Sequence, residues 1–208
     1  MNQAPLLDEV AGYYADRLAQ HGSTPQGVDW NGEEGQRLRF AQLLQVVAPD
    51  GEGELLDLGC GYGALLDTLR PRFQKLRYLG LDVSPPMVAA ARERHGADPL
   101  ARFELGARPA QPVDYAVASG IFNVRLSRSE DEWRAYVLDT LDTMHASTRR
   151  GFAFNCLTSY SDADRMRADL HYADPCALFH HCKTRYSRQV ALLHDYGLYE
   201  FTVIVRKP

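Results

Sequence analysis

Three glycines at alternate positions constrain the fold of this 208-residue chain more than any other feature. They stand in the stretch ELLDLGCGYG, residues 54–63, as Gly59, Gly61 and Gly63. Glycine loses more conformational freedom on folding than other residues, so such a cluster is typical of backbone that turns sharply or approaches a ligand closely. Apolar residues before it predict a buried strand, and the residues after it predict a helix. The stretch therefore predicts a strand that ends in a glycine-rich turn.

From this turn onward, predicted strands alternate with predicted helices. The short apolar runs that predict strands lie at residues 54–59, 77–83, 100–105, 113–119 and 151–157. Helix starts are indicated by Ser84 followed by Pro85, by the capping-box pair Ser129 and Glu132, and by Asp174 ahead of a proline. This alternation predicts an α/β fold with a mostly parallel sheet and helices on both faces.

The final strand is expected to break the parallel pattern. Residues 188–207 read as two strands around a tight turn at Tyr196 and Gly197. That connection is too short for the crossover that parallel neighbours need. We therefore predict a mostly parallel sheet with an antiparallel last strand.

Two further helices are predicted ahead of the sheet, at residues 6–20 and 33–47, with turn-forming residues 21–32 between them. We expect residues 1–50 to form an N-terminal helical cap on a core of residues 51–208, all within a single domain. The cap either closes over a ligand as a lid or simply covers one face of the sheet. The aromatic and polar groups that it would bring to a ligand are Tyr13, Tyr14, Trp30, Asn31, Gln36 and Arg39.

Charge and hydropathy narrow the range of partners. The formal net charge is −4, so the basic excess typical of nucleic-acid-binding domains is missing. No apolar run approaches the ~20 residues that a membrane helix needs. The first ten residues lack the basic start and apolar core of a secretory signal, and the four cysteines are irregularly spaced. We expect a cytoplasmic protein with reduced thiols and no nucleic-acid or membrane partner.

The glycine turn should lie at a ligand site, because such sheets bind ligands outside the carboxyl ends of their strands. The second strand ends at Asp82, where a carboxylate can accept hydrogen bonds from both hydroxyls of a ribose. This pattern alone fits NAD or another adenosine cofactor. Three features favour the latter: Asp57 precedes the glycines, no second nucleotide-binding half follows, and the chain ends in the reversed hairpin.

At these residues the sequence resembles the class I S-adenosylmethionine-dependent methyltransferases. LLDLGCGYG is similar to their first motif, YLGLDVSPPMVAAAR to their second, and DYAVASGIFN to their fourth-strand segment. The resemblance spans about residues 54–208. It implies a Rossmann-like, seven-stranded sheet and S-adenosylmethionine as the cofactor.

The resemblance also implies which residues hold this cofactor. Asp57, Gly59 and Gly61, with Cys60 between the glycines, are expected along its amino-acid end, Asp82 at the ribose, Val83 and Met87 beside the adenine, and Ser119 and Gly120 under the sulfonium. Leu105, Gly106 and Ala107 stand where the family often carries an acidic residue for the adenine amino group. Backbone atoms are left to supply that contact.

The acceptor is expected over the methyl donor, where the fourth strand, the fifth strand and the last hairpin end. The residues gathered at this edge are Phe122, Asn123, Tyr160, His194, Asp195, Tyr196 and Glu200. Aromatic walls with a few polar groups are typical of small-molecule pockets, and Tyr14 and Trp30 of the cap should complete the pocket. His194 is the first candidate for a base that removes an acceptor proton and His171 the second, although either can be a structural histidine.

A metal site is not expected. Cys176 and His180 stand four residues apart on a predicted helix, but a structural zinc usually takes four ligands in paired spacing. No Asn/Asp-Pro-Pro-aromatic motif follows the fourth strand. In this family that motif marks enzymes that methylate amino groups of bases or amides.

We expect a methyltransferase that acts on a small molecule, with O-methylation of a natural-product or sugar-type acceptor favoured. One alternative is a relative that uses the same cofactor for other chemistry, which a cationic residue such as Arg125 near the sulfonium would favour. Another is a non-catalytic cofactor-binding partner protein, which would lack an acceptor pocket. An NAD oxidoreductase is the least favoured.

Overall fold

The computed structural model describes residues 4–30 and 32–208, so the predicted cap residue Asn31 lies outside the described residues. The helices are α1 (Ala4–His21), α2 (Glu33–Leu43), α3 (Ala64–Leu69), α4 (Pro85–His95), α5 (Glu130–Ser147) and α6 (Pro175–Arg185), with short 3-10 turns at Pro25–Val28, Leu44–Val46 and Ala163–Arg165. The strands are β1 (Glu54–Leu58), β2 (Arg77–Asp82), β3 (Ala101–Leu105), β4 (Val113–Ala118), β5 (Thr148–Thr158), β6 (Tyr172–Ala173), β7 (Gln189–Leu193) and β8 (Glu200–Arg206).

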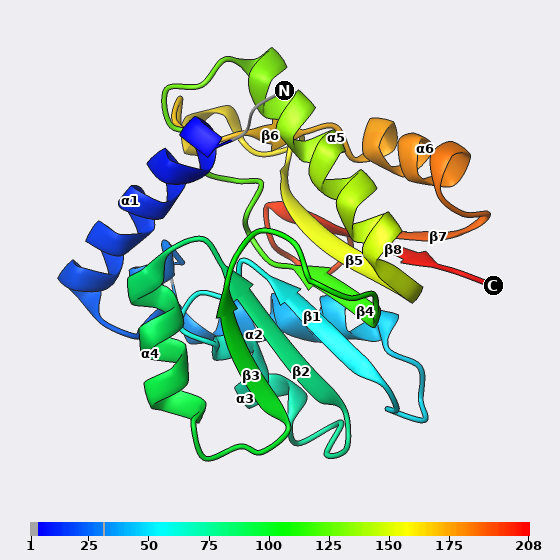
Figure 1. The fold of residues 1–208 in the computed structure, drawn as a ribbon. Coiled ribbons are helices and arrows are strands. Elements are labelled where there is room, and N and C mark those ends of the chain that lie inside the picture. The colour runs from blue at the N-terminus through cyan, green and yellow to red at the C-terminus, as the bar shows by residue number, and fades with distance from the viewer. Residues whose placement is uncertain (1–3, 31) are drawn as a thin grey trace.

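The strands form one sheet in the order β3-β2-β1-β4-β5-β8-β7 (Figure 1). Strands β1 to β5 pair in parallel, whereas β8 is antiparallel to both β5 and β7. The predicted mostly parallel sheet with a reversed last strand is thus confirmed. Because β1, β2 and β4 are parallel neighbours, their carboxyl ends meet at one edge, where such sheets bind ligands.

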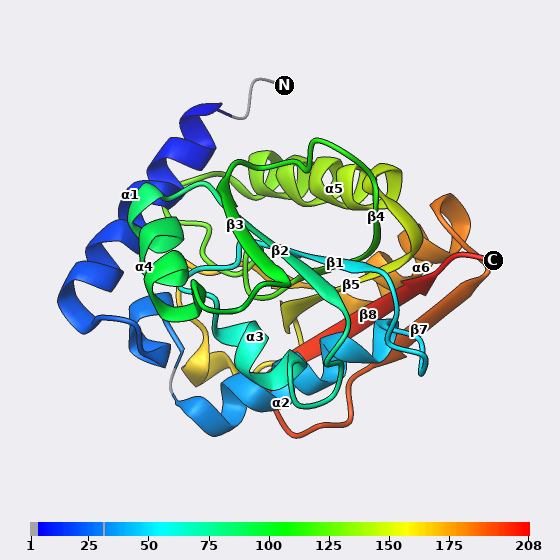
Figure 2. The same cartoon turned by 60° about the horizontal axis from the view of Figure 1, so that its bottom comes forward.

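Helices cover both faces of the sheet, as predicted, with α5 and α6 on one face and α2 and α3 on the other (Figure 2). The first face is sealed by fully buried aromatic side chains, including Trp133 of α5 and Phe152 and Phe154 of β5. On the second face, Leu65 of α3 packs in one cluster with Leu55 of β1. These apolar layers hold the strand ends in fixed positions.

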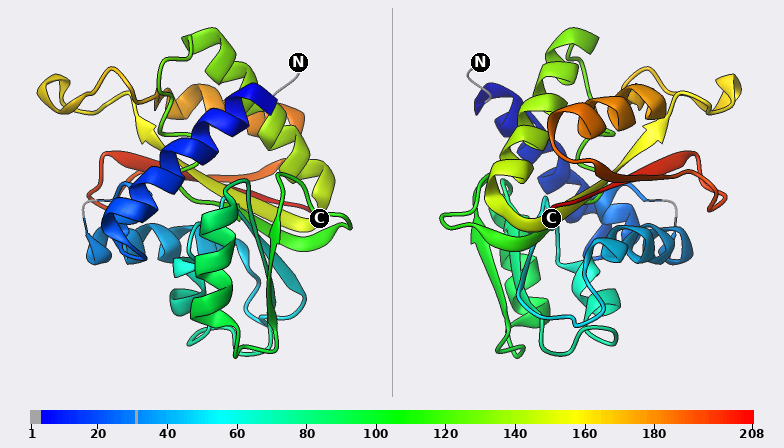
Figure 3. Two further views of the ribbon diagram at one scale, coloured as in Figure 1. Left: turned by 60° about the vertical axis from the view of Figure 1, so that its left-hand side comes forward. Right: turned by 90° about the vertical axis from the view of Figure 1, so that its right-hand side faces the viewer.

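The N-terminal helix α1 crosses the front of the molecule in the left view of Figure 3. Two sets of polar contacts attach it to the rest of the chain. Glu9 accepts two hydrogen bonds from Arg128, at 2.8 and 2.6 Å. Asp29 accepts a hydrogen bond from Tyr13 at 3.0 Å and pairs with Arg17 at 2.9 Å. Among the described helices, none is both long and apolar enough to cross a membrane.

The connection from β3 to β4 is unusually short. Parallel strands are generally joined through a dozen or more residues, usually a helix. Here residues 106–112 alone carry the chain from β3, past β2 and β1, to β4. The start of this connection, at Gly106, Ala107 and Arg108, lies at the ligand edge of the sheet.

Three local features differ from the sequence-based expectation. The two-residue strand β6 adds an eighth strand beside the end of β5. The turn between β7 and β8 is not tight, because residues 194–199 separate the two strands. Ser84 does precede helix α4, but its hydroxyl caps nothing and has no hydrogen-bond partner among the described residues.

The predicted capping box at α5 is present and yields a stability test. The Ser129 hydroxyl accepts a hydrogen bond from the Glu132 backbone N–H, and the Glu132 carboxylate accepts one from the Ser129 N–H. We expect Ser129→Ala to lower the free energy of unfolding by about 1 kcal/mol in urea denaturation. The exposed Ser23→Ala serves as the control, and equal midpoints for both variants would contradict a stabilising role for the cap.

Candidate functional site

The first cavity opens where β1, β2 and β4 end. Each strand contributes side chains to its wall: Asp57 from β1, Asp82 from β2, and Ser119 directly after β4. All nine residues that the sequence assigned to the cofactor line it: Asp57, Gly59, Cys60, Gly61, Asp82, Val83, Met87, Ser119 and Gly120. These positions, which lie far apart in the sequence, converge because the strands are parallel neighbours.

The glycine-rich turn has a backbone conformation that residues other than glycine adopt only with strain. Gly59 and Gly61 have φ values of 74° and 54°, in the left-handed region that glycine tolerates best. A Cβ atom on Gly59 would lie 2.2 Å from Cγ2 of Ile121. The Gly59 and Cys60 N–H groups both donate to the Leu81 carbonyl, at 2.8 and 3.0 Å, which ties the turn to β2.

Asp82 locks the turn from the other side. Its carboxylate accepts hydrogen bonds from the backbone N–H of Gly61 and of Ser84, each at 2.8 Å. Burial raises the pKa of Asp82, and these backbone hydrogen bonds oppose the rise. Each carboxylate oxygen keeps a further lone pair, so Asp82 can still accept hydrogen bonds from a ligand's hydroxyl groups.

Asp57 lies deeper, at the floor of the first cavity. The Tyr78 hydroxyl donates to its Oδ2 atom at 2.6 Å. Burial raises the pKa of Asp57 to about 7; the Tyr78 hydrogen bond opposes this, and the charge of Asp82 adds to it. A cationic group bound beside Asp57 would favour its ionised form.

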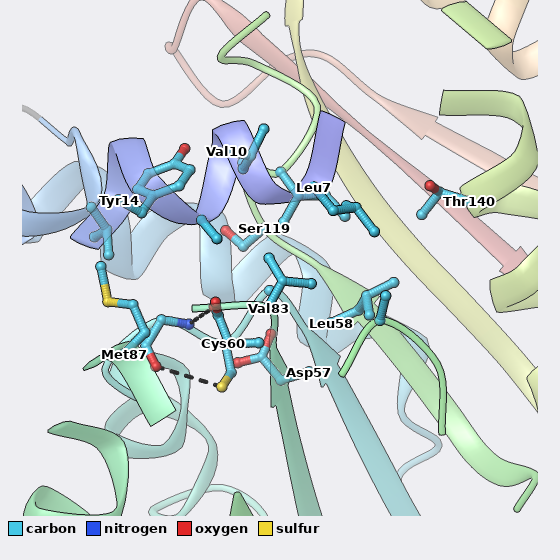
Figure 4. A pocket seen from close by; sticks show the side chains of 18 of the residues that line it. Leu7, Val10, Tyr14, Asp57, Leu58, Cys60, Val83, Met87, Ser119 and Thr140 are labelled. Carbon is cyan, nitrogen blue, oxygen red and sulfur yellow. Dashed lines mark hydrogen bonds between the residues drawn. The ribbon is translucent and has the colours of Figure 1, made fainter. Parts of the chain in front are cut away.

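Helix α1 forms the opposite wall. Leu7, Val10 and Tyr14 lie on one side of the first cavity, and Asp57, Cys60 and Val83 face them (Figure 4). The hydroxyl of Ser119 is buried without a hydrogen-bond partner among the described residues. These groups together fit an adenosine cofactor: two carboxylates, the glycine turn without bulky side chains, an unpartnered hydroxyl and apolar walls.

A second cavity adjoins the first. Tyr14, Val28, Trp30 and Gly120 line both. Its outer wall combines aromatic side chains (Tyr172, Tyr199) with charged ones (Asp29, Glu33, Glu34, Arg39, Arg165, Arg167, Glu200). As expected, the ends of the fourth strand, the fifth strand and the last hairpin meet here, through Asn123, Leu157 and the residues from Gly197 to Glu200.

A series of polar contacts connects Gly120, which lines both cavities, to Glu200 and Arg39 of the second cavity. The Gly120 N–H donates to Oδ1 of Asn155 at 2.8 Å, and Nδ2 of Asn155 donates to Oε2 of Glu200 at 2.5 Å. Nε of Arg39 donates to Oε1 of Glu200 at 2.8 Å.

Trp30 connects the two ends of this series of contacts, because it lies against both Arg39 and Gly120. The Arg39 guanidinium stacks 4.0 Å from the centre of the Trp30 ring, a distance typical of a cation–π contact. A Cβ on Gly120 would lie 2.4 Å from that same ring.

Comparison with known proteins identifies the family. The model of the methyltransferase domain family matches residues 56–151. A Mycobacterium tuberculosis protein named "Putative methyltransferase Rv1506c" is 63% identical over 164 residues, which is 79% of this chain and 99% of that protein. The chain belongs to the class I S-adenosylmethionine-dependent methyltransferases. Its cofactor is therefore S-adenosylmethionine, which supplies an activated methyl group.

Other similarities are partial or concern the fold alone. A trans-aconitate 2-methyltransferase of Variovorax paradoxus is 42% identical over 84 residues, which is 38% of this chain and 31% of that protein. The structure of magnesium protoporphyrin IX methyltransferase from Synechocystis with bound S-adenosylhomocysteine superposes with a TM-score of 0.70, at 11% identity and full coverage of both chains. A complex of DhpI with S-adenosylhomocysteine gives 0.65, at 16% identity over 98% of this chain and 97% of that one.

The structure divides the predicted acceptor residues of this methyltransferase into two groups. Tyr14, Trp30 and Asn123 line the second cavity. Phe122 is fully buried in the core, and Tyr160 is 68% exposed. Tyr196 is half-buried and shares a hydrogen bond with Thr202 at 3.0 Å. These last three are not among the described residues that line either cavity.

The two histidines proposed as bases also lie outside the described cavity walls. His194 packs against the rings of Tyr160 and Phe201. His171 contacts Glu130 through Nδ1 at 2.9 Å, and burial lowers its pKa. Their catalytic role stays a prediction without support from these contacts.

The sequence placed Arg39 and Glu200 near the acceptor but gave them no role. Their pairing depends on contact between α2 and β8, which no local pattern reveals. No group of three or more His, Cys, Asp or Glu side chains that could hold a metal ion occurs among the described residues.

The pKa of Asp57 leads to a prediction about stability and pH. A carboxyl group with a native pKa of about 7 against an ordinary value of 3.8 keeps its proton in the folded state where the unfolded chain has lost it. The contribution of Asp57 to stability is therefore greatest below its ordinary pKa of 3.8 and is lost as the pH rises through about 7. We expect Asp57→Asn to flatten this fall by a few kcal/mol (~1.4 per pKa unit at most) in urea denaturation between about pH 5 and pH 8.

The exposed Asp67→Asn on α3 is the control for this measurement, and its profile should match that of the unaltered protein. If the free energy of unfolding falls as steeply with pH in Asp57→Asn as in the unaltered protein, the group that titrates is not Asp57. Asp82 and Glu200 are the next carboxyls to replace, because burial raises the pKa of both.

Proposed function

We propose that this methyltransferase transfers the methyl group to an oxygen atom of a small polar acceptor, of natural-product or sugar type. The observation that carries the proposal is the second cavity, which shares part of its wall with the first. A methyl donor in the first cavity and an acceptor in the second would meet at this shared wall. Such positioning can account for much of the acceleration of an in-line displacement.

The roles of the residues in the first cavity follow from its chemistry. Asp82 would hold the two ribose hydroxyls, and Asp57 with the turn from Gly59 to Gly61 would bind the amino-acid end. Val83 and Met87 would contact the adenine, and the backbone from Gly106 to Arg108 borders the same cavity. Ser119 and Gly120, directly after β4, would lie under the sulfonium.

The composition of the second cavity supports a hydroxyl-bearing acceptor. Trp30, Tyr172 and Tyr199 offer flat apolar surfaces, and carboxylates and guanidinium groups between them can bind hydroxyls. This mixture suits a compact, hydrogen-bonding molecule better than a purely apolar one. The net charge of −4 argues against a nucleic-acid acceptor.

Residues 1–50 would act as a lid within a single domain. Helix α1 supplies Leu7, Val10, Ala11 and Tyr14 to the first cavity, and the loop after it supplies Val28 and Trp30 to both cavities. Closing the site in this way would keep water from the reacting groups.

Two alternative functions gain less support. A non-catalytic cofactor-binding protein would have no need of the second cavity. For other chemistry with the same cofactor, the cation that the sequence suggested, Arg125, pairs with Glu130 at 3.0 Å and is not among the described residues that line either cavity.

Calorimetric titration with S-adenosylmethionine, S-adenosylhomocysteine and NAD tests the cofactor assignment. We expect both sulfur compounds to bind and NAD not to bind. Asp82→Ala should weaken both sulfur compounds by about the same factor, on the order of tenfold to a hundredfold, because charge-assisted hydrogen bonds to the ribose are common to both. Glu104→Ala, an exposed carboxylate on neighbouring β3, is the matched control. Preference for NAD, or no binding of the sulfur pair, would refute the proposed cofactor roles.

A further inference from the structure

The reaction must take place where the two cavities meet. Among the described residues, Tyr14, Val28, Trp30 and Gly120 line both cavities, so a donor in the first and an acceptor in the second would touch beside them. An acceptor hydroxyl must also lose its proton as the new bond forms, and a nearby base helps. The base must then belong to the second cavity and lie close to Gly120.

The carboxylates of the second cavity differ in burial. Asp29, Glu33, Glu34 and Glu200 are the candidates among the described residues. Glu33 and Glu34 are exposed, and Glu33 pairs with Arg37 at 2.6 Å. Asp29 is occupied by Tyr13 and Arg17 of α1. Only Glu200, with 1% of its surface exposed, is buried.

Polar contacts also connect Glu200 to the shared wall. One side chain, Asn155, bridges its Oε2 atom at 2.5 Å to the Gly120 N–H at 2.8 Å. On its other side, Arg39 connects Oε1 to the stacked ring of Trp30. Gly120 and Trp30, which line both cavities, thus contact Asn155 and Arg39, the two partners of Glu200.

We propose that Glu200 faces the transferred methyl group and receives the acceptor's proton. The acceptor oxygen forms a bond to the methyl carbon as the methyl–sulfur bond breaks, and the electron pair of that bond stays on sulfur. The hydroxyl proton passes to a carboxylate oxygen of Glu200, and water later removes it. This inference rests on the proposed O-methylation.

Burial and the ion pair with Arg39 act in opposite directions on the pKa of this base. Burial raises the pKa of Glu200, while Arg39 and Asn155 oppose the rise. The charge of Glu200 in turn contributes to raising the pKa of two neighbouring titratable groups, Tyr196 of the β7–β8 connection and Cys156 of β5. Burial also raises the pKa of both, so they stay neutral near pH 7. The charged pair is therefore Glu200 and Arg39.

Comparing S-adenosylmethionine with S-adenosylhomocysteine tests the proposal without a known acceptor. The first carries a positive sulfonium and the second a neutral thioether, while their ribose and amino-acid ends are the same. A carboxylate that faces the methyl group must favour the sulfonium. We expect Glu200→Gln to weaken S-adenosylmethionine by about tenfold in calorimetry, and S-adenosylhomocysteine by less than about twofold.

Two variants separate this electrostatic role from a structural one. Arg39→Gln breaks the same ion pair but keeps the carboxylate, so it should not reduce the preference for S-adenosylmethionine. Glu104→Gln removes an exposed carboxylate of β3 that lines neither cavity, and it should leave both affinities unchanged. If Glu200→Gln changes both ligands alike, or neither, the proposal is wrong while the cofactor assignment stands. If the unaltered protein binds neither ligand, the cofactor assignment itself fails.

The unaltered protein gives the same answer should Glu200→Gln not fold. The charges of Asp57 and Asp82 also act on a sulfonium in the same cavity. The ratio of the two dissociation constants is therefore measured in Asp57→Asn as well, where the carboxyl group with a pKa of about 7 is absent. Protonation of Glu200 at acid pH should therefore lower the preference for S-adenosylmethionine. A ratio that does not change with pH would overturn the proposal.

Discussion

The carboxylate of Asp82 holds together the part of the molecule on which the rest of the site depends. Its two backbone hydrogen bonds connect the glycine turn after β1 to the start of α4. The bond from Gly61 requires β1 and β2 to be parallel neighbours with their carboxyl ends at one edge, whereas the bond from Ser84 is local. A buried carboxylate is costly unless it is hydrogen-bonded, so the turn and the carboxylate stabilise each other.

A second buried carboxylate organises the wall of the second cavity in a different way. Glu200 joins α2, β5 and β8 through Arg39 and Asn155. Breaking such a buried pair is usually more harmful than removing both partners, because it leaves an unpaired charge. This is why the variants at these positions need a readout that separates charge from folding.

The sequence predicts this molecule best where structure is local. Strand ends, the glycine turn and the capping box each depend on residues close together in the chain, and the short connection before β8 sufficed to predict its reversed direction. Long-range contacts were not predictable. The sequence of β8 does not show that Arg39 of α2 lies against Glu200. Nor do the residues that follow β4 and β5 show that Phe122 is buried while Tyr160 is exposed. The pairing of β6 with β5 likewise depends on how the intervening residues fold back.

The shared wall of the two cavities has a thermodynamic consequence. Trp30 and Gly120 contact both spaces, so a ligand that shifts either residue alters the binding of its neighbour. Such coupling is reciprocal: whatever factor the cofactor imposes on acceptor affinity, the acceptor imposes on cofactor affinity. Because the spent cofactor is a neutral thioether and no longer carries the sulfonium charge, this factor changes during turnover. The two products therefore need not leave in the order in which the two substrates arrived.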